Sequence, residues 1–151
     1  MTDIIIREFD ERDAETVSRL ILNNLVFVNS RDYEPSVIDY MCNLFTPAYL
    51  RKISATRTMF VAEENGVVVG TVGLEGDEVC ALYVDPAAHG RRVGERLLRR
   101  IEEFAWSHHI HFLHLSASLT AVGFYEKMGY RSKEREKSEF FGPAYIMTKL
   151  L

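Results

Sequence analysis

The segment EVCALYVDPAAHGRRVGERLLRRIEEFAWSH, residues 78–108, carries the strongest pattern in the sequence. Its beginning, residues 78–84, is a nearly continuous apolar run, which is typical of a central strand buried on both faces. From about Arg91 onward, apolar side chains recur every three or four positions, which predicts an amphipathic helix that ends near His108. A buried strand followed at once by such a helix indicates an α/β protein.

The loop between this strand and this helix has the chemistry of an anion site. The first N–H groups of a helix lack intrahelical partners, and the helix dipole favours negative charge there. Glycines let a ligand approach the backbone closely, and the arginines can add charge-assisted bonds to phosphate oxygens. The segment has neither the G-x-G-x-x-G of a dinucleotide fold nor a Walker Gly-Lys-Ser/Thr. We therefore predict a diphosphate site, against the alternative of an ordinary surface turn. Its residues are His89, Gly90, Arg91, Arg92, Val93, Gly94 and Glu95.

Upstream of this segment, the sequence predicts an edge strand, a helical region and a hairpin. The strand covers residues 4–9, and Asp10 or Asp13 can cap the helix that follows. Further helices are expected from Pro35 and over residues 47–53. From Met59 the apolar period changes to that of strands, and Asn65-Gly66 is a strong hairpin signal.

Downstream, the pattern predicts a strand, a short helix and two final strands. The strand covers HFLHLSA at residues 111–117, and the helix covers residues 120–128, with Ser118 or Thr120 as its cap. The final strands are expected around residues 130–139 and 144–150. Strands that alternate with helices after an antiparallel run indicate a mixed α/β sheet.

Length and composition limit the remaining possibilities. The chain has 151 residues without a linker or repeat, so we expect one domain over residues 1–151. A net charge of −4 argues against nucleic acid or an anionic membrane as partner. No apolar run approaches the roughly 20 residues that span a bilayer, and residues 1–13 do not resemble a signal peptide. Cys42 and Cys80 form no zinc motif and are expected as free thiols, which favours the cytoplasm.

Two motifs resemble those of the GNAT acetyltransferase superfamily. The family's acetyl-CoA signature is Gln/Arg-x-x-Gly-x-Gly/Ala before a Leu-Leu helix; here Gly94 and Leu97-Leu98 match, whereas His89 and Arg92 depart from it. The segment AVGFYEKMGY, residues 121–130, is close to the family's Ala-x-x-Phe-Tyr-Glu-Lys-x-Gly-Phe. The resemblance implies the GNAT fold, an α/β architecture with a mixed, mostly antiparallel sheet of about seven strands flanked by about four or five helices.

The resemblance also implies an activity, the transfer of an acetyl group from acetyl-CoA to a primary amine of a small molecule or peptide. Tyr125 then corresponds to the general acid that protonates the leaving thiolate, with Phe124 expected in the core and Tyr125 in the cleft. Glu78 is the first candidate for the base that deprotonates the amine, Glu75 is the second, and a water molecule remains an alternative.

In the same family, the main chain of the central strand binds the pantetheine arm like an added strand. Here the corresponding residues are Leu82 and Val84, and a backbone N–H near Val84 would stabilise the oxyanion. Ser118 stands where many members carry an Asn that contacts the coenzyme. These three residues complete the predicted acetyl-CoA site.

Other readings of the sequence stay open or are rejected. A non-catalytic acyl-CoA-binding or regulatory domain is the alternative function, and transfer of a longer acyl group is a third. We predict no metal site, because His111 and His114 point to opposite faces of a strand. Asp32, Glu34 and Asp39 are candidates for attracting a cationic acceptor. The pair Phe140-Phe141 is a candidate for the acceptor site or a homodimer contact.

Overall fold

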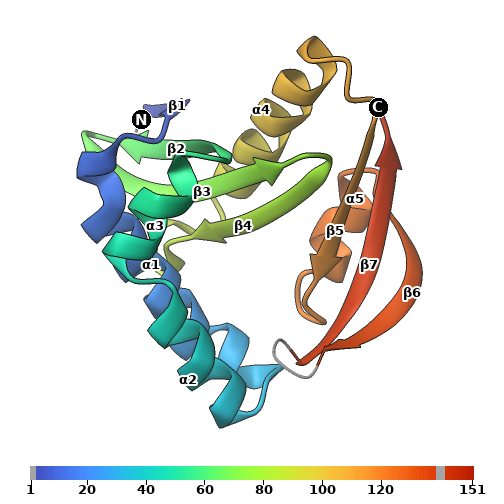
Figure 1. Cartoon of the computed structure of the whole chain (residues 1–151), viewed down its shortest axis with the longest axis horizontal. Coiled ribbons are helices and arrows are strands. Elements are labelled where there is room, and N and C mark those ends of the chain that lie inside the picture. The colour runs from blue at the N-terminus through green and yellow to red at the C-terminus, as the bar shows by residue number, and fades with distance from the viewer. Residues whose placement is uncertain (1–2, 139–141) are drawn as a thin grey trace.

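The computed structural model describes residues 3–138 and 142–151. Within these residues the strands form one seven-stranded sheet in the order β1-β2-β3-β4-β5-β7-β6 (Figure 1). β4 and β5 are parallel, and all other neighbours are antiparallel. The strands are β1 (Ile4–Glu8), β2 (Thr58–Glu64), β3 (Val67–Glu75), β4 (Glu78–Val84), β5 (Phe112–Ala117), β6 (Arg131–Ser138) and β7 (Gly142–Leu150). The expected mixed, mostly antiparallel sheet is confirmed.

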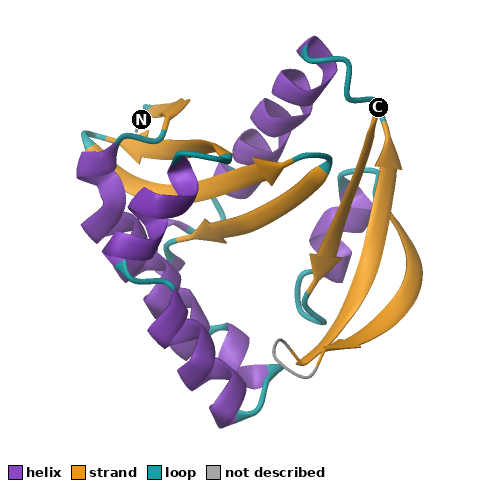
Figure 2. Ribbon diagram, viewed as in Figure 1, coloured by secondary structure: helices purple, strands orange, loops and turns teal. Residues whose placement is uncertain are grey.

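Helices cover both faces of the sheet (Figure 2). In the described part of the chain they are α1 (Ala14–Phe27), α2 (Pro35–Leu44), α3 (Pro47–Ser54), α4 (Val93–Ser107) and α5 (Val122–Lys127). Helices α1–α3 pack on alternate residues of β2, including Met59 and Val61, in one hydrophobic cluster. Helices α4 and α5 pack on the other face, which includes Phe60 and Ala62. None of the helices in these residues is long and apolar enough to cross a membrane.

The sheet splits between its two central strands, and this split positions the site. β4 and β5 pair only at Glu78 and His114, after which the strands diverge (Figure 1). Ala81, at φ 50°, and a register shift against β3 bend β4 at the split. The prediction that β4 is buried on both faces is therefore wrong, since Val79 is the one residue of β4 classed as buried. The apolar run instead borders an open cleft.

Turn chemistry explains where several elements begin and end. Asn65 and Gly66 both have positive φ, at 51° and 81°, as the predicted hairpin requires. Asp10 accepts a bond from the N–H of Arg12 and caps the turn before α1, as predicted. Helix α4 begins at Val93, later than predicted, because Arg92 is left-handed. The predicted cap of α5 by Ser118 or Thr120 does not form: the N-cap residue is Ala121, and no side chain caps this described helix.

Candidate active site

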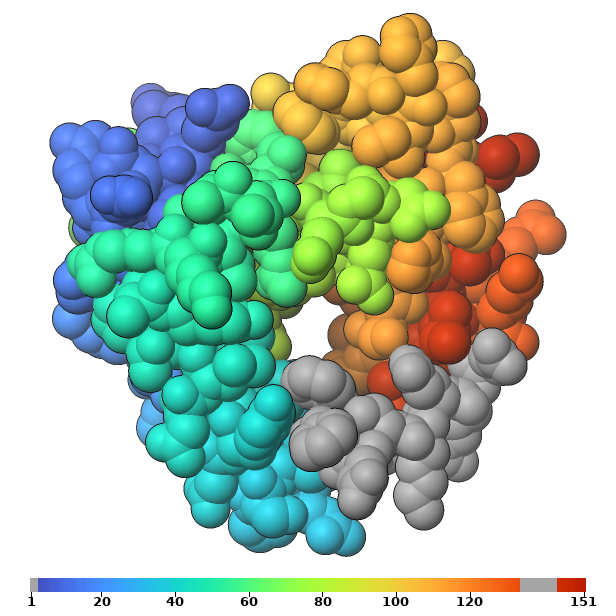
Figure 3. Space-filling model, in the orientation of Figure 1, coloured from blue at the N-terminus to red at the C-terminus, as the bar shows by residue number. Residues whose placement is uncertain are grey.

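The split between β4 and β5 opens a cleft of about 780 Å³. Figure 3 shows an opening through the centre of the molecule, bordered by the green β3–β4 region and the orange β5 region. One wall, the α4–α5 half, comes from residues between 88 and 95 and between 121 and 127. The opposite wall, the α1–α2 half, includes Asn24, Val28, Asn29, Tyr33, Met41, Cys80 and Tyr83. The cleft thus joins the predicted anion loop to side chains from distant elements.

The loop before α4 presents backbone donors to the cleft. The N–H of Arg96 makes the first intrahelical bond, to the carbonyl of Arg92 at 3.1 Å, which leaves the preceding N–H groups without helical partners. Gly90 has φ 85°, where other residues are strained, and a side chain there would meet open space. A Cβ on Gly94 would lie 3.5 Å from the Phe124 ring. This exposed backbone is suited to a diphosphate.

The two arginines of the loop point to different places. Arg92 lines the cleft and is exposed, and its backbone adopts the left-handed conformation with φ 61°. Arg91 is tied to the β2–β3 hairpin: it contacts Glu64 at 3.0 Å and donates to the carbonyl of Ala87 at 2.9 Å. Arg91 is not among the described residues that line the cleft. Arg92 is therefore the arginine whose charge lies at the cleft. Arg91 instead anchors the loop to the β2–β3 hairpin.

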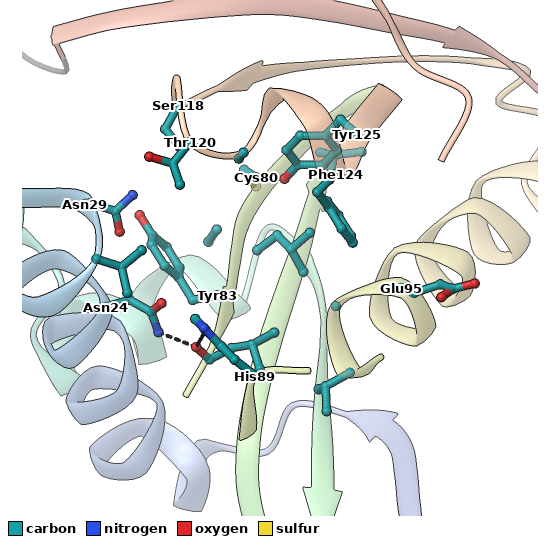
Figure 4. A pocket seen from close by; sticks show the side chains of 18 of the residues that line it. Asn24, Asn29, Cys80, Tyr83, His89, Glu95, Ser118, Thr120, Phe124 and Tyr125 are labelled. Atoms are coloured by element: carbon teal, nitrogen blue, oxygen red, sulfur yellow. Dashed lines mark hydrogen bonds between the residues drawn. The ribbon is translucent and has the colours of Figure 1, made fainter. Parts of the chain in front are cut away.

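The carbonyl of Val84, at the end of β4, receives two side-chain hydrogen bonds. Asn24 Nδ2 donates to it at 2.5 Å and His89 Nε2 donates at 2.9 Å (Figure 4). A carbonyl oxygen has two lone pairs, and these two donors occupy both of them. A ligand that binds to this carbonyl like an added strand would therefore displace one of the donors. Leu82 and Val84 both line the cleft, as does Ser118. The predicted pantetheine residues are thus brought together, with His89 as the exposed donor at the Val84 carbonyl.

Tyr125 is the buried phenol of the α4–α5 half. It is 8% exposed, and its ring packs edge-on against Phe124 at 5.1 Å and Tyr130 at 5.7 Å. Burial raises the pKa of Tyr125 well above its usual value, so the phenol stays protonated at neutral pH. Figure 4 shows its hydroxyl directed into the cleft near Cys80. Phe124 also lines the cleft, so the expected division between a core Phe124 and a cleft Tyr125 does not hold.

The predicted carboxylates lie at the closed end of the split. Glu78 is at the start of β4, where its carboxylate is 4.0 Å from His114 Nδ1. Glu75 accepts a hydrogen bond from Arg57 at 2.9 Å on the far side of the β3–β4 turn. Neither glutamate is among the described residues that line the cleft. Proton transfer from an amine in the cleft to either residue would need a water relay.

The remaining candidates have structural roles or fall outside the description. Asp32 accepts hydrogen bonds from the N–H and the hydroxyl of Thr120, so it joins the α1–α2 connection to the loop before α5. Glu34 and Asp39 are exposed, and none of the three acidic residues is a described lining residue of the cleft. Phe140 and Phe141 lie outside the described residues. No cluster of three metal-binding side chains occurs within 3–138 and 142–151.

Several cleft residues are not identified by sequence reasoning. Asn24 is 5% exposed and occupies the apolar stripe of α1, where a polar residue is itself a signal. Tyr83 lies within the apolar run of β4, and its ring packs edge-on against Phe45 at 5.9 Å. Tyr33 and Asn29 come from the connection between α1 and α2, which carries no motif. These side chains make the wall that faces Tyr125.

Comparisons with known proteins identify the family. A family model described as an acetyltransferase (GNAT) domain matches residues 33–151. The chain therefore belongs to the GNAT acetyltransferase family, and it is an acyltransferase enzyme. It is similar to the peptidyl-lysine N-acetyltransferase YjaB of Salmonella typhimurium, at 30% identity over 92 residues, which cover 55% of this chain and 56% of that protein. The match thus spans about half the length of this curated relative.

Solved structures agree over the whole chain. A GCN5-related N-acetyltransferase from Rhodopseudomonas palustris has 26% identity and a TM-score of 0.92, with 100% of this chain and 98% of that chain covered. The PaiA N-acetyltransferase of Thermoplasma acidophilum, crystallised with coenzyme A, has 20% identity and a TM-score of 0.85, with 99% of both chains covered. The expected GNAT fold is confirmed.

Proposed function

We propose that this enzyme transfers an acetyl group from acetyl-CoA to a primary amine, with Tyr125 as the general acid. One observation carries the proposal: a single cleft joins the free backbone N–H groups at the start of α4 to the protonated hydroxyl of Tyr125. Acetyl-CoA supplies the activated thioester. The coenzyme in the PaiA structure supports the choice of cofactor.

The residues of the cleft suit the parts of this co-substrate. The loop from His89 to Glu95, with Arg92 as its cleft-facing cation, would hold the diphosphate. Leu82, Val84 and Ser118 would flank the pantetheine arm, and a backbone N–H of bent β4 would stabilise the oxyanion. Arg91 would fix the loop through Glu64 rather than contact phosphate.

The proposed reaction is a direct attack. The amine nitrogen bonds to the thioester carbonyl carbon, the carbon–sulfur bond breaks, and the hydroxyl of Tyr125 gives its proton to the departing thiolate. The proton lost by the amine passes to water, with Glu78 as a more distant acceptor. Tyr125 regains a proton from solvent. A phenol whose pKa is raised by burial is protonated before the reaction, as this role requires.

We further infer one domain in a reducing compartment, the cytoplasm, that acts on a small-molecule or peptide acceptor. Cys42 and Cys80 are free thiols, which supports such a compartment. Burial raises the pKa of Cys80 to about 11, so this thiol is not poised to act as a nucleophile.

The test combines coenzyme binding with turnover. Calorimetry should detect coenzyme A binding, and a panel of amines should include acceptors that release thiol from acetyl-CoA. Tyr125→Phe should lower kcat about 100-fold with unchanged affinity for coenzyme A. Tyr49→Phe is the matched control, because Tyr49 packs on Phe45 and is not a described lining residue. Coenzyme binding without thiol release for any amine would favour a non-catalytic domain.

A further inference from the structure

The two halves of the cleft differ in charge. The charged side chains that line it within the described residues, Arg92, Glu95 and Lys127, all belong to the α4–α5 half. Across the cleft, the α1–α2 half presents amides, phenols, a thioether and a thiol. The acidic residue of that connection, Asp32, is bound to Thr120 instead.

The titratable groups of the α1–α2 half also stay neutral. Burial and the nearby charge of Asp32 raise the pKa of Tyr33, and burial together with the neighbouring tyrosines raises the pKa of Tyr83 well above its usual value. The thiol of Cys80 is likewise protonated at neutral pH. An ammonium group in this half would therefore lose hydration without a carboxylate among the described lining residues, because Asp32 already accepts two hydrogen bonds from Thr120, and this loss is costly.

The same side chains offer neutral hydrogen-bond acceptors and apolar surface. Asn24 uses its Nδ2 to bond the carbonyls of Leu20 and Val84, so its Oδ1 remains as an acceptor. In Figure 4, the side chain of Tyr83 reaches from β4 toward Asn29, with the hydroxyl at the end nearest that residue. Such groups can bind the uncharged form of an amine, the form that attacks a thioester.

We propose that the α1–α2 half is an uncharged acceptor subsite, which takes a primary amine on a neutral, partly aromatic body and discriminates against acceptors with a second positive charge. The inference rests on the proposed acetyl transfer. The inference predicts that polyamines and other polycations are poor acceptors. Their additional ammonium groups need carboxylate partners, and the described residues of this wall include none.

A matched pair of acceptors tests the inference. 1-Pentylamine and 1,5-diaminopentane share a carbon chain and differ by one ammonium group; phenylalanine amide and lysine amide extend the comparison to an aromatic body. For the native enzyme, kcat/KM should be at least about tenfold higher for the singly charged member of each pair. Equal or better turnover of the diamine would overturn the subsite while leaving the acetyltransferase function intact.

A charge-introducing variant gives the reverse test. Asn29→Asp places a carboxylate in the subsite and should shift the ratio of kcat/KM about tenfold toward the diamine. Asn43→Asp is the control, because Asn43 is exposed on α2 and outside the described lining, and it should leave the ratio unchanged. An unchanged ratio in Asn29→Asp would also overturn the inference. Coenzyme binding without acetylation of any amine would overturn the proposed transfer and the subsite together.

Tyr83→Phe tests the neutral hydrogen-bonding group. Its KM for the amine should rise about fivefold, with KM for acetyl-CoA unchanged, because the phenol is one of the hydrogen-bonding groups of the α1–α2 half. Tyr49→Phe should change neither KM. An unchanged KM for the amine in Tyr83→Phe would remove Tyr83 from the subsite.

Discussion

The two halves of the cleft are built in different ways. In the α4–α5 half, consecutive residues supply the predicted anion loop: a left-handed Arg92, a glycine at positive φ and the first turn of α4. In the α1–α2 half, side chains from a helix, a connection and a strand meet only after folding, as Asn24, Tyr33 and Tyr83 do. The first half depends on backbone conformation, and the second depends on which side chains the fold brings together.

Because of this contrast, the two halves should differ in how well they tolerate amino-acid substitutions. A site made of backbone N–H groups tolerates many side chains, so His89 and Arg92 can replace the family's usual residues there. A wall made of side chains changes its chemistry with each substitution. On the proposed assignment, acceptor choice can therefore vary on one scaffold while the backbone site for the coenzyme is kept.

The largest expected effects come from the hydrophobic clusters that support each half. Leu97 packs below the α4–α5 half and Ile21 below the α1–α2 half, and both are fully buried. Leu97→Ala and Ile21→Ala should each lower the free energy of unfolding by about 3 kcal/mol. Urea unfolding should show a single transition for each variant, because both clusters share the sheet. Two separate transitions would mean that the halves fold independently.

Acid should weaken the start of α1, which carries part of the acceptor wall. Burial favours a raised pKa for Asp13, but hydrogen bonds from Arg7 at 2.8 and 2.9 Å and from the N–H of Asp10 hold the pKa of this carboxyl below its usual value. The resulting stability is therefore present above about pH 4 and is lost as pH falls through the folded pKa. Asp13→Asn should cost about 2 kcal/mol at pH 7 by urea unfolding.

The difference between Asp13→Asn and the native protein should shrink as pH falls below about 4, where the unfolded chain takes up the proton first, and should vanish once the native carboxyl is also protonated. Asp39→Asn, on the exposed surface of α2, serves as the control and should change stability little at either pH. A constant difference down to pH 2 would assign the stability to packing instead of charge.

A smaller effect is expected from the arginine in the left-handed position. Arg92→Asn keeps a residue that tolerates positive φ and removes the charge, so coenzyme A affinity should fall about tenfold without loss of stability. Calorimetry measures the first effect and thermal unfolding the second. Arg96→Asn, one turn along and outside the described lining, should bind coenzyme A nearly as the native protein does. Equal losses in both variants would indicate only a long-range effect of charge.

The smallest effect concerns the contact that joins the halves. Asp32→Ala removes the acceptor of both hydrogen bonds that join the α1–α2 connection to the loop before α5, and Thr120→Val removes the hydroxyl donor of one of them. Each should raise KM for the amine about threefold, and the double variant should be no worse than either single variant. Additive losses would show that the two residues act separately.

Local chemistry in the sequence was sufficient to predict much of the fold. The Asn65-Gly66 turn, the cap at Asp10 and the amphipathic α4 depend on neighbouring residues, and each forms as expected. The loop before α4 also follows from adjacent residues. The prediction that Tyr125 lies at the cleft comes from the family resemblance of residues 121–130, because local chemistry does not place α5 beside that loop.

Only the tertiary structure decided the exposure of β4, the direction of Arg91 and the remoteness of Glu78 from the cleft. It also decided that Asn24 and Tyr83 share a wall, although one belongs to α1 and the other to β4. The physical reason is the split of the sheet. Backbone conformation is set by interactions within a few residues, whereas the divergence of β4 from β5 is set by packing on both faces at once.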